Sequence, residues 1–209
     1  ANIITSLYGN IVMGGIYSVD VFFFMSAFLG AFLMIPKLKK LNPVVLGMIY
    51  FHRFFRILPT LGLFLFLFIT FFIYLGSGPI WHVTKELFVA PCEKYWWTNM
   101  LFINNFYPPS EDINCMNFLW YLANDMLFFM FLPLVAFTYC ANKLMGYAVT
   151  IFWILASIIV TFIISETGNH PATTVKDSNP RIIYHMPWAR FGAYFVGCLF
   201  GIMYYEWNQ

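Results

Sequence analysis

The chain has 209 residues, of which 61% are hydrophobic and only 10% are charged, and its formal net charge is +2. Soluble domains contain roughly 45–50% apolar and 25% charged residues, so this composition excludes a soluble enzyme and indicates an integral membrane protein. A charge so close to zero also gives no reason to expect a nucleic-acid partner.

Long uncharged stretches predict five transmembrane helices, at residues 18–35, 55–76, 118–139, 144–165 and 188–205. Each is close to the length that crosses about 30 Å of hydrocarbon. Their Phe, Leu and Ile runs are continuous, whereas strands of a membrane barrel alternate apolar and polar residues. We therefore expect an all-α, polytopic helix bundle that forms a single membrane domain over residues 1–209. The first stretch follows Ala1 without a basic segment, so we expect a portion of a longer protein and no signal peptide.

Basic residues crowd the connection between the first two predicted helices, namely Lys37, Lys39, Lys40, Arg53 and Arg56. Connections rich in Lys and Arg stay on the cytosolic side of a membrane. We therefore expect this connection to be cytosolic and the long connection 77–117 to be exoplasmic. By alternation, the connection 167–186 is exoplasmic as well.

The four cysteines divide by environment. Cys92 and Cys115 share the connection 77–117, where an oxidising compartment would let them form a disulfide, the alternative being two free thiols in a reducing compartment. Cys140 and Cys198 lie in apolar helices and are expected to be small core residues. The aromatic segment 96–108 of the same connection is expected to lie at the membrane interface or to fold back over the helix ends.

Asp125 is the most informative polar residue, because it lies near the start of the third predicted helix in LWYLANDMLFF. A carboxylate there costs at least about 2.5–3.5 kcal/mol unless a partner or a polar cavity receives it. Asn124 precedes it, and Asp20 opens the first helix in the same way. The partial positive charge at a helix N-terminus favours both acids. We expect Asp125 to point into the bundle, with Asp20 or Arg56 lining the same cavity.

The two arginines at the start of the second predicted helix have two interpretations. Arg53 and Arg56 are either anchors that reach anionic headgroups or, for Arg56 in particular, ligands of an anionic group such as a diphosphate. The histidines offer no clear base for catalysis, since His52, His82, His170 and His185 all fall in or beside predicted connections. The sequence also contains no HxxxH or CxxC metal spacing and no GxSxG motif.

Six strings occur in one order along the chain: SVDVFFFMSAF (18–28), FHRFFRILP (51–59), LGSGPIW (75–81), WWTNMLFINNF (96–106), LWYLANDMLFF (119–129) and MPWARFGAYFVGCLFG (186–201). Together they resemble the acyltransferase-three superfamily, most closely its nose-resistant-to-fluoxetine-like branch. The resemblance implies a multi-helix membrane enzyme that moves an acyl group from a donor such as acyl-coenzyme A to a hydroxyl acceptor. It also implies a catalytic histidine on a helix that precedes Ser18 and lies outside this chain.

The resemblance implies roles for residues of this chain too. Asp125 and Asp20 are the expected catalytic residues, and Arg53, Arg56, Asn124 and Trp120 are the expected substrate-binding residues. Acyl-coenzyme A is expected as a substrate, with no bound cofactor and no metal. Membrane lipids and other membrane chains are the further expected partners.

Three residues depart from the family pattern: Ala27, Leu127 and Phe129 stand where Gly, Gln and Tyr are common. These changes make the expected site more apolar, and they leave two alternatives to the enzyme open. One is a non-catalytic structural or lipid-holding subunit of a larger assembly, and the other is a transporter of hydrophobic compounds. The endomembrane system or the plasma membrane is the expected location, with the mitochondrial inner membrane as the alternative for a structural subunit.

Overall fold

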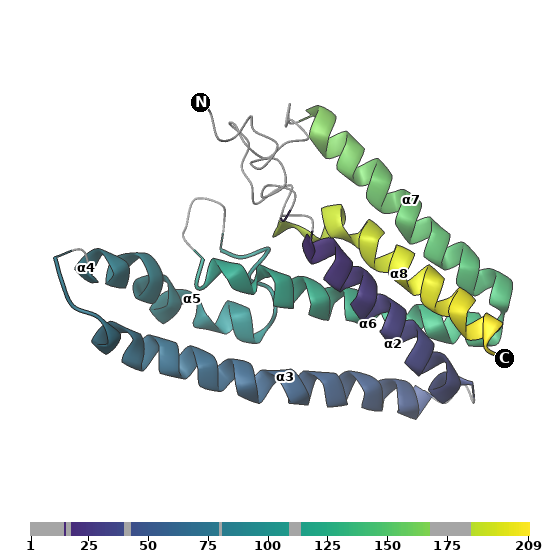
Figure 1. Ribbon diagram of the computed structural model, residues 1–209, viewed down its shortest axis with the longest axis horizontal. Helices are drawn as coiled ribbons and strands as arrows, with labels where there is room; N and C mark the ends of the chain where they lie inside the picture. Colours follow the sequence, from purple (N-terminus) through teal and green to yellow (C-terminus); the bar gives the residue numbers. More distant parts are fainter. Residues whose placement is uncertain (1–14, 16–17, 40–42, 80, 109–113, 168–184) are drawn as a thin grey trace. The chain divides into compact units, whose positions relative to one another are not determined.

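A computed structural model describes residues 15, 18–39, 43–79, 81–108, 114–167 and 185–209. Every regular element in these ranges is a helix (Figure 1). The long helices are α2 (Ser18–Leu38), α3 (Pro43–Phe71), α6 (Trp120–Ala141), α7 (Lys143–Thr167) and α8 (Pro187–Trp207). Each of the five predicted helices is therefore present, and the expected all-α bundle is confirmed.

Four helical stretches of the described residues are long and apolar enough to cross a membrane: Ser18–Leu38, Pro43–Leu75, Asn117–Ala141 and Lys143–Thr167. The fifth predicted span, 188–205, is a helix but is not among the four. Arg190 and several Gly and Tyr residues lower the hydropathy of α8.

The second predicted helix starts earlier than expected. We predicted a start at residue 55, whereas α3 begins at Pro43 and continues through the short 3-10 turn η3 (Phe72–Leu75). Proline suits the first turn of a helix because its missing N–H has no partner there. As a result, Arg53 and Arg56 lie inside α3 rather than at its entrance.

The chain forms two compact units, which are described separately here. Unit 1 contains α2, residues 131–141 of α6, α7 and α8 from Trp188. Unit 2 contains α3, residues 120–130 of α6, the connection between these helices and the short segment before α8.

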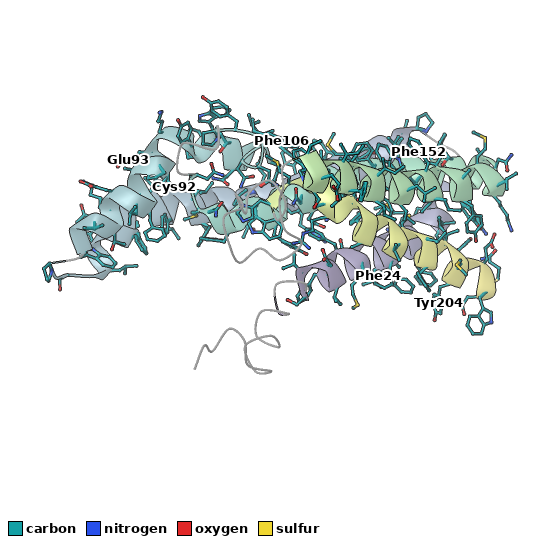
Figure 2. All side chains as sticks on the ribbon, turned by 90° about the horizontal axis from the view of Figure 1, so that it is seen from above. Phe24, Cys92, Glu93, Phe106, Phe152 and Tyr204 are labelled. Carbon is teal, nitrogen blue, oxygen red and sulfur yellow. A yellow bond between two sulfur atoms is a disulfide. The ribbon has the colours of Figure 1, made fainter. Side chains whose placement is uncertain are left out.

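Unit 1 is held together by close approach of α8 to α2. A Cβ on Gly197 would lie 2.2 Å from the carbonyl oxygen of Phe24, and one on Gly201 would lie 2.6 Å from that of Phe28. Glycines four residues apart lie on one helix face and let two backbones approach in a membrane. Aromatic rings flank this seam, as between Phe28 and Tyr204, whose centroids are 5.6 Å apart (Figure 2 labels Phe24 and Tyr204).

Unit 2 folds the long connection back onto α3. The connection forms α4 (Trp81–Thr84), the π-helical turn η4 (Lys85–Val89), α5 (Ala90–Met100) and the 3-10 turn η5 (Asn117–Leu119). The predicted disulfide between Cys92 and Cys115 is confirmed, and it lies in a buried cluster with Leu61 and Leu65 of α3. In the described part of this connection, α5 packs along α3.

Candidate active site

The charged pair of unit 2 joins Arg53 of α3 to Asp125 of α6. Arg53 Nη2 donates to Asp125 Oδ2, and the two side chains are only 17% and 12% exposed. The guanidinium carbon of Arg53 also lies 4.0 Å from the ring centroid of Phe129, one turn further along α6. A cation beside a carboxylate offsets part of the cost of placing that carboxylate away from water. Asp125 thus faces α3, where its partner is Arg53.

The identity of this partner corrects the prediction for Arg56. We expected Arg56 or Asp20 beside Asp125 and regarded an anchoring role for Arg53 as equally plausible. Arg53 is instead the buried partner, and the side chain of Arg56 is exposed. The two arginines are three residues apart, and only Arg53 reaches the start of α6.

A buried amide network surrounds the residue before Asp125. Asn124 is fully buried, and its Nδ2 donates to the carbonyl oxygen of His185 at 2.8 Å. Asn124 Oδ1 accepts a hydrogen bond from Asn105 Nδ2 at 2.7 Å. Asn105 Nδ2 also donates to the carbonyl oxygen of Trp120 at 3.0 Å. Amides with both ends engaged fix the geometry of a buried site. The network therefore holds the aromatic connection and the segment before α8 against the first turns of α6.

Trp120 and His185 form the aromatic wall of this network. Their rings stack at a centroid distance of 5.2 Å, and Trp120 is only 8% exposed. The sequence predicts His185 to be a loop histidine before the last helix. It does lie directly before α8, but the fold brings it to the residue adjacent to Asp125. No spacing in the sequence relates these two positions, so periodicity could not have found the contact.

A second charged pair lies in unit 1. Arg190 Nη1 of α8 donates to Asp20 Oδ2 of α2 at 2.6 Å, and Arg190 is 5% exposed. The other carboxylate oxygen of Asp20 is buried and has no hydrogen-bond partner among the described residues. Sequence reasoning selected Asp20 but did not identify Arg190 as its partner.

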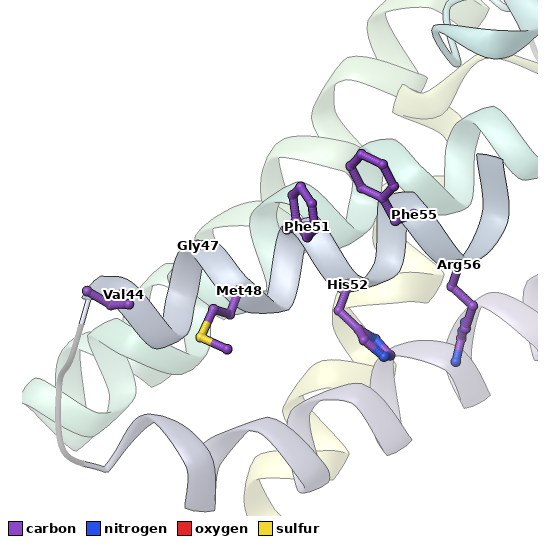
Figure 3. Close-up of a pocket in the computed structure, with 7 residues that line it drawn as sticks. All are labelled: Val44, Gly47, Met48, Phe51, His52, Phe55 and Arg56. Carbon is purple, nitrogen blue, oxygen red and sulfur yellow. The ribbon is translucent and has the colours of Figure 1, made fainter. Parts of the chain in front are cut away.

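A pocket of about 740 Å³ lies along one side of α3 (Figure 3). Its lining residues all belong to this helix: Val44, Gly47, Met48, Phe51, His52, Phe55 and Arg56. His52 and Arg56 are one turn apart and point to the same side, whereas Phe51 and Phe55 form an apolar edge. The pocket therefore combines an apolar wall with two groups that can donate to an anion.

Comparison with known proteins shows which family the chain belongs to. A family model described as an acyltransferase domain matches residues 2–209. The chain belongs to the acyltransferase-three family. It is similar to the nose resistant to fluoxetine protein 6 of Caenorhabditis elegans, with 28% identity over 214 residues that cover 91% of this chain and 26% of that protein. The chain thus spans about a quarter of the length of this relative. No solved structure matches it.

Within this member of the acyltransferase-three family, the fold gathers some of the predicted site residues and separates others. Arg53, Asn124, Asp125 and Trp120 come together in unit 2, whereas Asp20 lies in unit 1 with its own arginine. The connection that contains His170 lies outside the described residues. The catalytic and substrate-binding roles of all these residues remain predictions.

Proposed function

We propose that this chain forms part of an integral membrane O-acyltransferase that moves an acyl group from a donor such as acyl-coenzyme A to a hydroxyl acceptor. The observation that carries the proposal is the shielded Arg53–Asp125 pair beside a fully buried asparagine network. Membership of the acyltransferase-three family supports the reaction class.

The reaction needs a group that orients the acceptor and one that withdraws electrons from the acyl carbonyl. The C–S bond of the donor breaks, a C–O bond to the acceptor forms, and the hydroxyl proton ends on the departing thiol. Asp125, held by Arg53, accepts a hydrogen bond from the acceptor hydroxyl. Arg53 Nε is buried without a hydrogen-bond partner in the described part of the chain, so it is available to an acyl oxygen. Donors placed at a developing oxyanion accelerate acyl transfer. The histidine implied before Ser18 takes the proton.

The pocket on α3 suits the donor. Its edge of Met48, Phe51 and Phe55 offers apolar surface to an acyl chain, and the exposed His52 and Arg56 offer charge and hydrogen bonds to phosphate. A guanidinium binds phosphate oxygens through two parallel N–H groups, which an amide cannot do. We therefore assign donor binding to Arg56 and acceptor orientation to Asp125.

Transfer kinetics of the full-length protein test this assignment. In liposomes that contain the wild-type protein, label from radiolabelled acyl-coenzyme A should appear in an ester. Arg56→Gln should raise the donor KM about tenfold, the scale of a lost charge-assisted hydrogen bond, with kcat nearly unchanged. Arg56→Lys keeps the positive charge, so its donor KM should lie between those of the wild type and Arg56→Gln. An unchanged KM in Arg56→Gln would refute the donor assignment.

A non-catalytic structural or lipid-holding subunit is the second candidate. The observation in its favour is Phe129, which stands where the resemblance expects a tyrosine and offers Arg53 only the face of a ring. This candidate predicts no ester from the wild-type protein with any donor. It also predicts that changes at Asp125 disturb assembly with other membrane chains rather than turnover.

A further inference from the structure

A second hollow lies in unit 2, between α3 and α5, apart from the residues assigned to acyl transfer. It has a volume of about 410 Å³ and is lined by Gly62, Leu65, Phe66 and Ile69 of α3 and by Glu93, Trp96 and Met100 of α5. The spacing of both sets follows one face of a helix. The hollow is therefore a groove that runs between two parallel stripes of side chains.

The floor of the groove depends on a glycine. A Cβ on Gly62 would lie 3.3 Å from the terminal methyl carbon of Met100, so any larger side chain would enter the space. The disulfide at Cys92 and the buried ring of Tyr95 hold α5 in place next to α3. Figure 2 shows Cys92 beside Glu93 on this helix. The groove is thus a fixed feature of the unit.

The size of the groove selects its occupant. The stripe from Gly62 to Ile69 rises about 10 Å along α3. A helix with its side chains is about 10–12 Å across. A single extended hydrocarbon chain is thinner than a helix, and the groove walls are apolar. The groove therefore suits an acyl chain.

One end of the groove carries an uncompensated negative charge. Glu93 is exposed and has no ion-pair partner among the described residues. The neighbouring Lys94 places its Nζ 4.7 Å from the centroid of the Tyr95 ring. Trp96, one turn further along α5, is 48% exposed and lines the same groove. A carboxylate beside an exposed indole favours a quaternary ammonium.

We infer that this groove binds a choline phospholipid, with one acyl chain along Gly62 and Phe66 and its ammonium group at Glu93 and Trp96. The site does not depend on the proposed acyl transfer. It lies on the connection that the charge pattern places on the exoplasmic side, so the lipid would come from that leaflet. An anionic lipid would be repelled by Glu93.

Photocrosslinking of lipid to the full-length protein in nanodiscs tests the inference. The probes are a photoactivatable phosphatidylcholine, the matching diacylglycerol without a headgroup and the matching phosphatidylglycerol, and the crosslinked peptides are identified by mass spectrometry. In the wild type, phosphatidylcholine should label the α5 peptide around Trp96 and Met100 more strongly than the other two. Absence of label at α5, or stronger label from phosphatidylglycerol, would overturn the inference.

Two substitutions separate the parts of the site. Glu93→Gln should lower labelling by phosphatidylcholine about two- to fivefold, the range for an exposed charge pair, and leave diacylglycerol labelling unchanged, whereas Glu93→Asp should keep the preference. Gly62→Leu should lower labelling by both lipids, and Gly62→Ala much less. Retained preference in Glu93→Gln would refute the headgroup assignment. Glu93 is exposed, so this variant is informative even where Gly62→Leu fails to fold.

Discussion

Replacement of Gly197 by alanine should destabilise unit 1 although it adds only one carbon. The new Cβ would lie 2.2 Å from the Phe24 carbonyl oxygen and 2.8 Å from its carbonyl carbon. Both are backbone atoms, so α8 must move away from α2, and contacts along the seam are lost. Overpacking of this kind costs about 1–3 kcal/mol, which outweighs the gain in helix propensity from glycine to alanine of up to about 1 kcal/mol.

Other glycines of the chain provide matched controls. A Cβ on Gly47 meets nothing within 4 Å, and one on Gly192 meets only the Ser157 side chain, at 3.3 Å. Gly47→Ala should therefore be neutral or stabilising, and Gly192→Ala should be intermediate. The same substitution in three helical positions separates the effect of close packing from that of propensity.

Thermal unfolding in detergent, followed with a dye that reacts with exposed thiols, measures the effect. Cys198 follows Gly197 and is fully buried, so its thiol becomes reactive when unit 1 opens. The midpoint for Gly197→Ala should fall by about 5 °C for a cost near 2 kcal/mol. A midpoint equal to that of Gly47→Ala would refute the close approach of the two helices.

Three further predictions follow from unit 2 and from the charge pattern. Replacement of Cys92 by serine opens a loop with a sequence separation of 23 and should cost about 3 kcal/mol, measured by unfolding under oxidising conditions; an unchanged midpoint would contradict it. Single cysteines at Lys39 and Thr84 should react with an impermeant reagent from opposite sides of the membrane, and same-side labelling would refute the topology. Arg53→Met leaves Asp125 without its cation and should cost about 3–5 kcal/mol, most of which Asp125→Leu in the same chain should recover; an unaffected single variant would contradict a buried pair.

The long helices could be predicted from the sequence because their signal is local. Continuous apolar runs predicted the positions of the five helices. The disulfide was predicted because Cys92 and Cys115 lie in the same connection. The start of α3 was predicted too late, because basic residues at Arg53 and Arg56 were interpreted as the end of a connection. The apolar residues that follow Pro43 belong to the same helix, and Asp125 compensates the charge of Arg53 inside it.

The partners of the charged residues could not be predicted in the same way. Asp20 and Arg190 are separated by 170 positions, and Arg53 and Asp125 by 72. Insertion energetics require that a buried carboxylate has a cation, but they do not say which one. The contact between Asn124 and His185 forms only because the fold brings the residue before α8 to the start of α6.

The rate of acyl transfer by Asp125→Asn in the full-length protein tests the central claim most directly. Asparagine keeps an oxygen that can accept from Arg53, so insertion and folding should be retained, as checked by the disulfide and the unfolding midpoint. The rate at equal amounts of folded protein should fall about 10²-fold or more, the scale for a positioned acid–base or orienting group. Transfer at the wild-type rate would contradict a catalytic role for the Arg53–Asp125 pair.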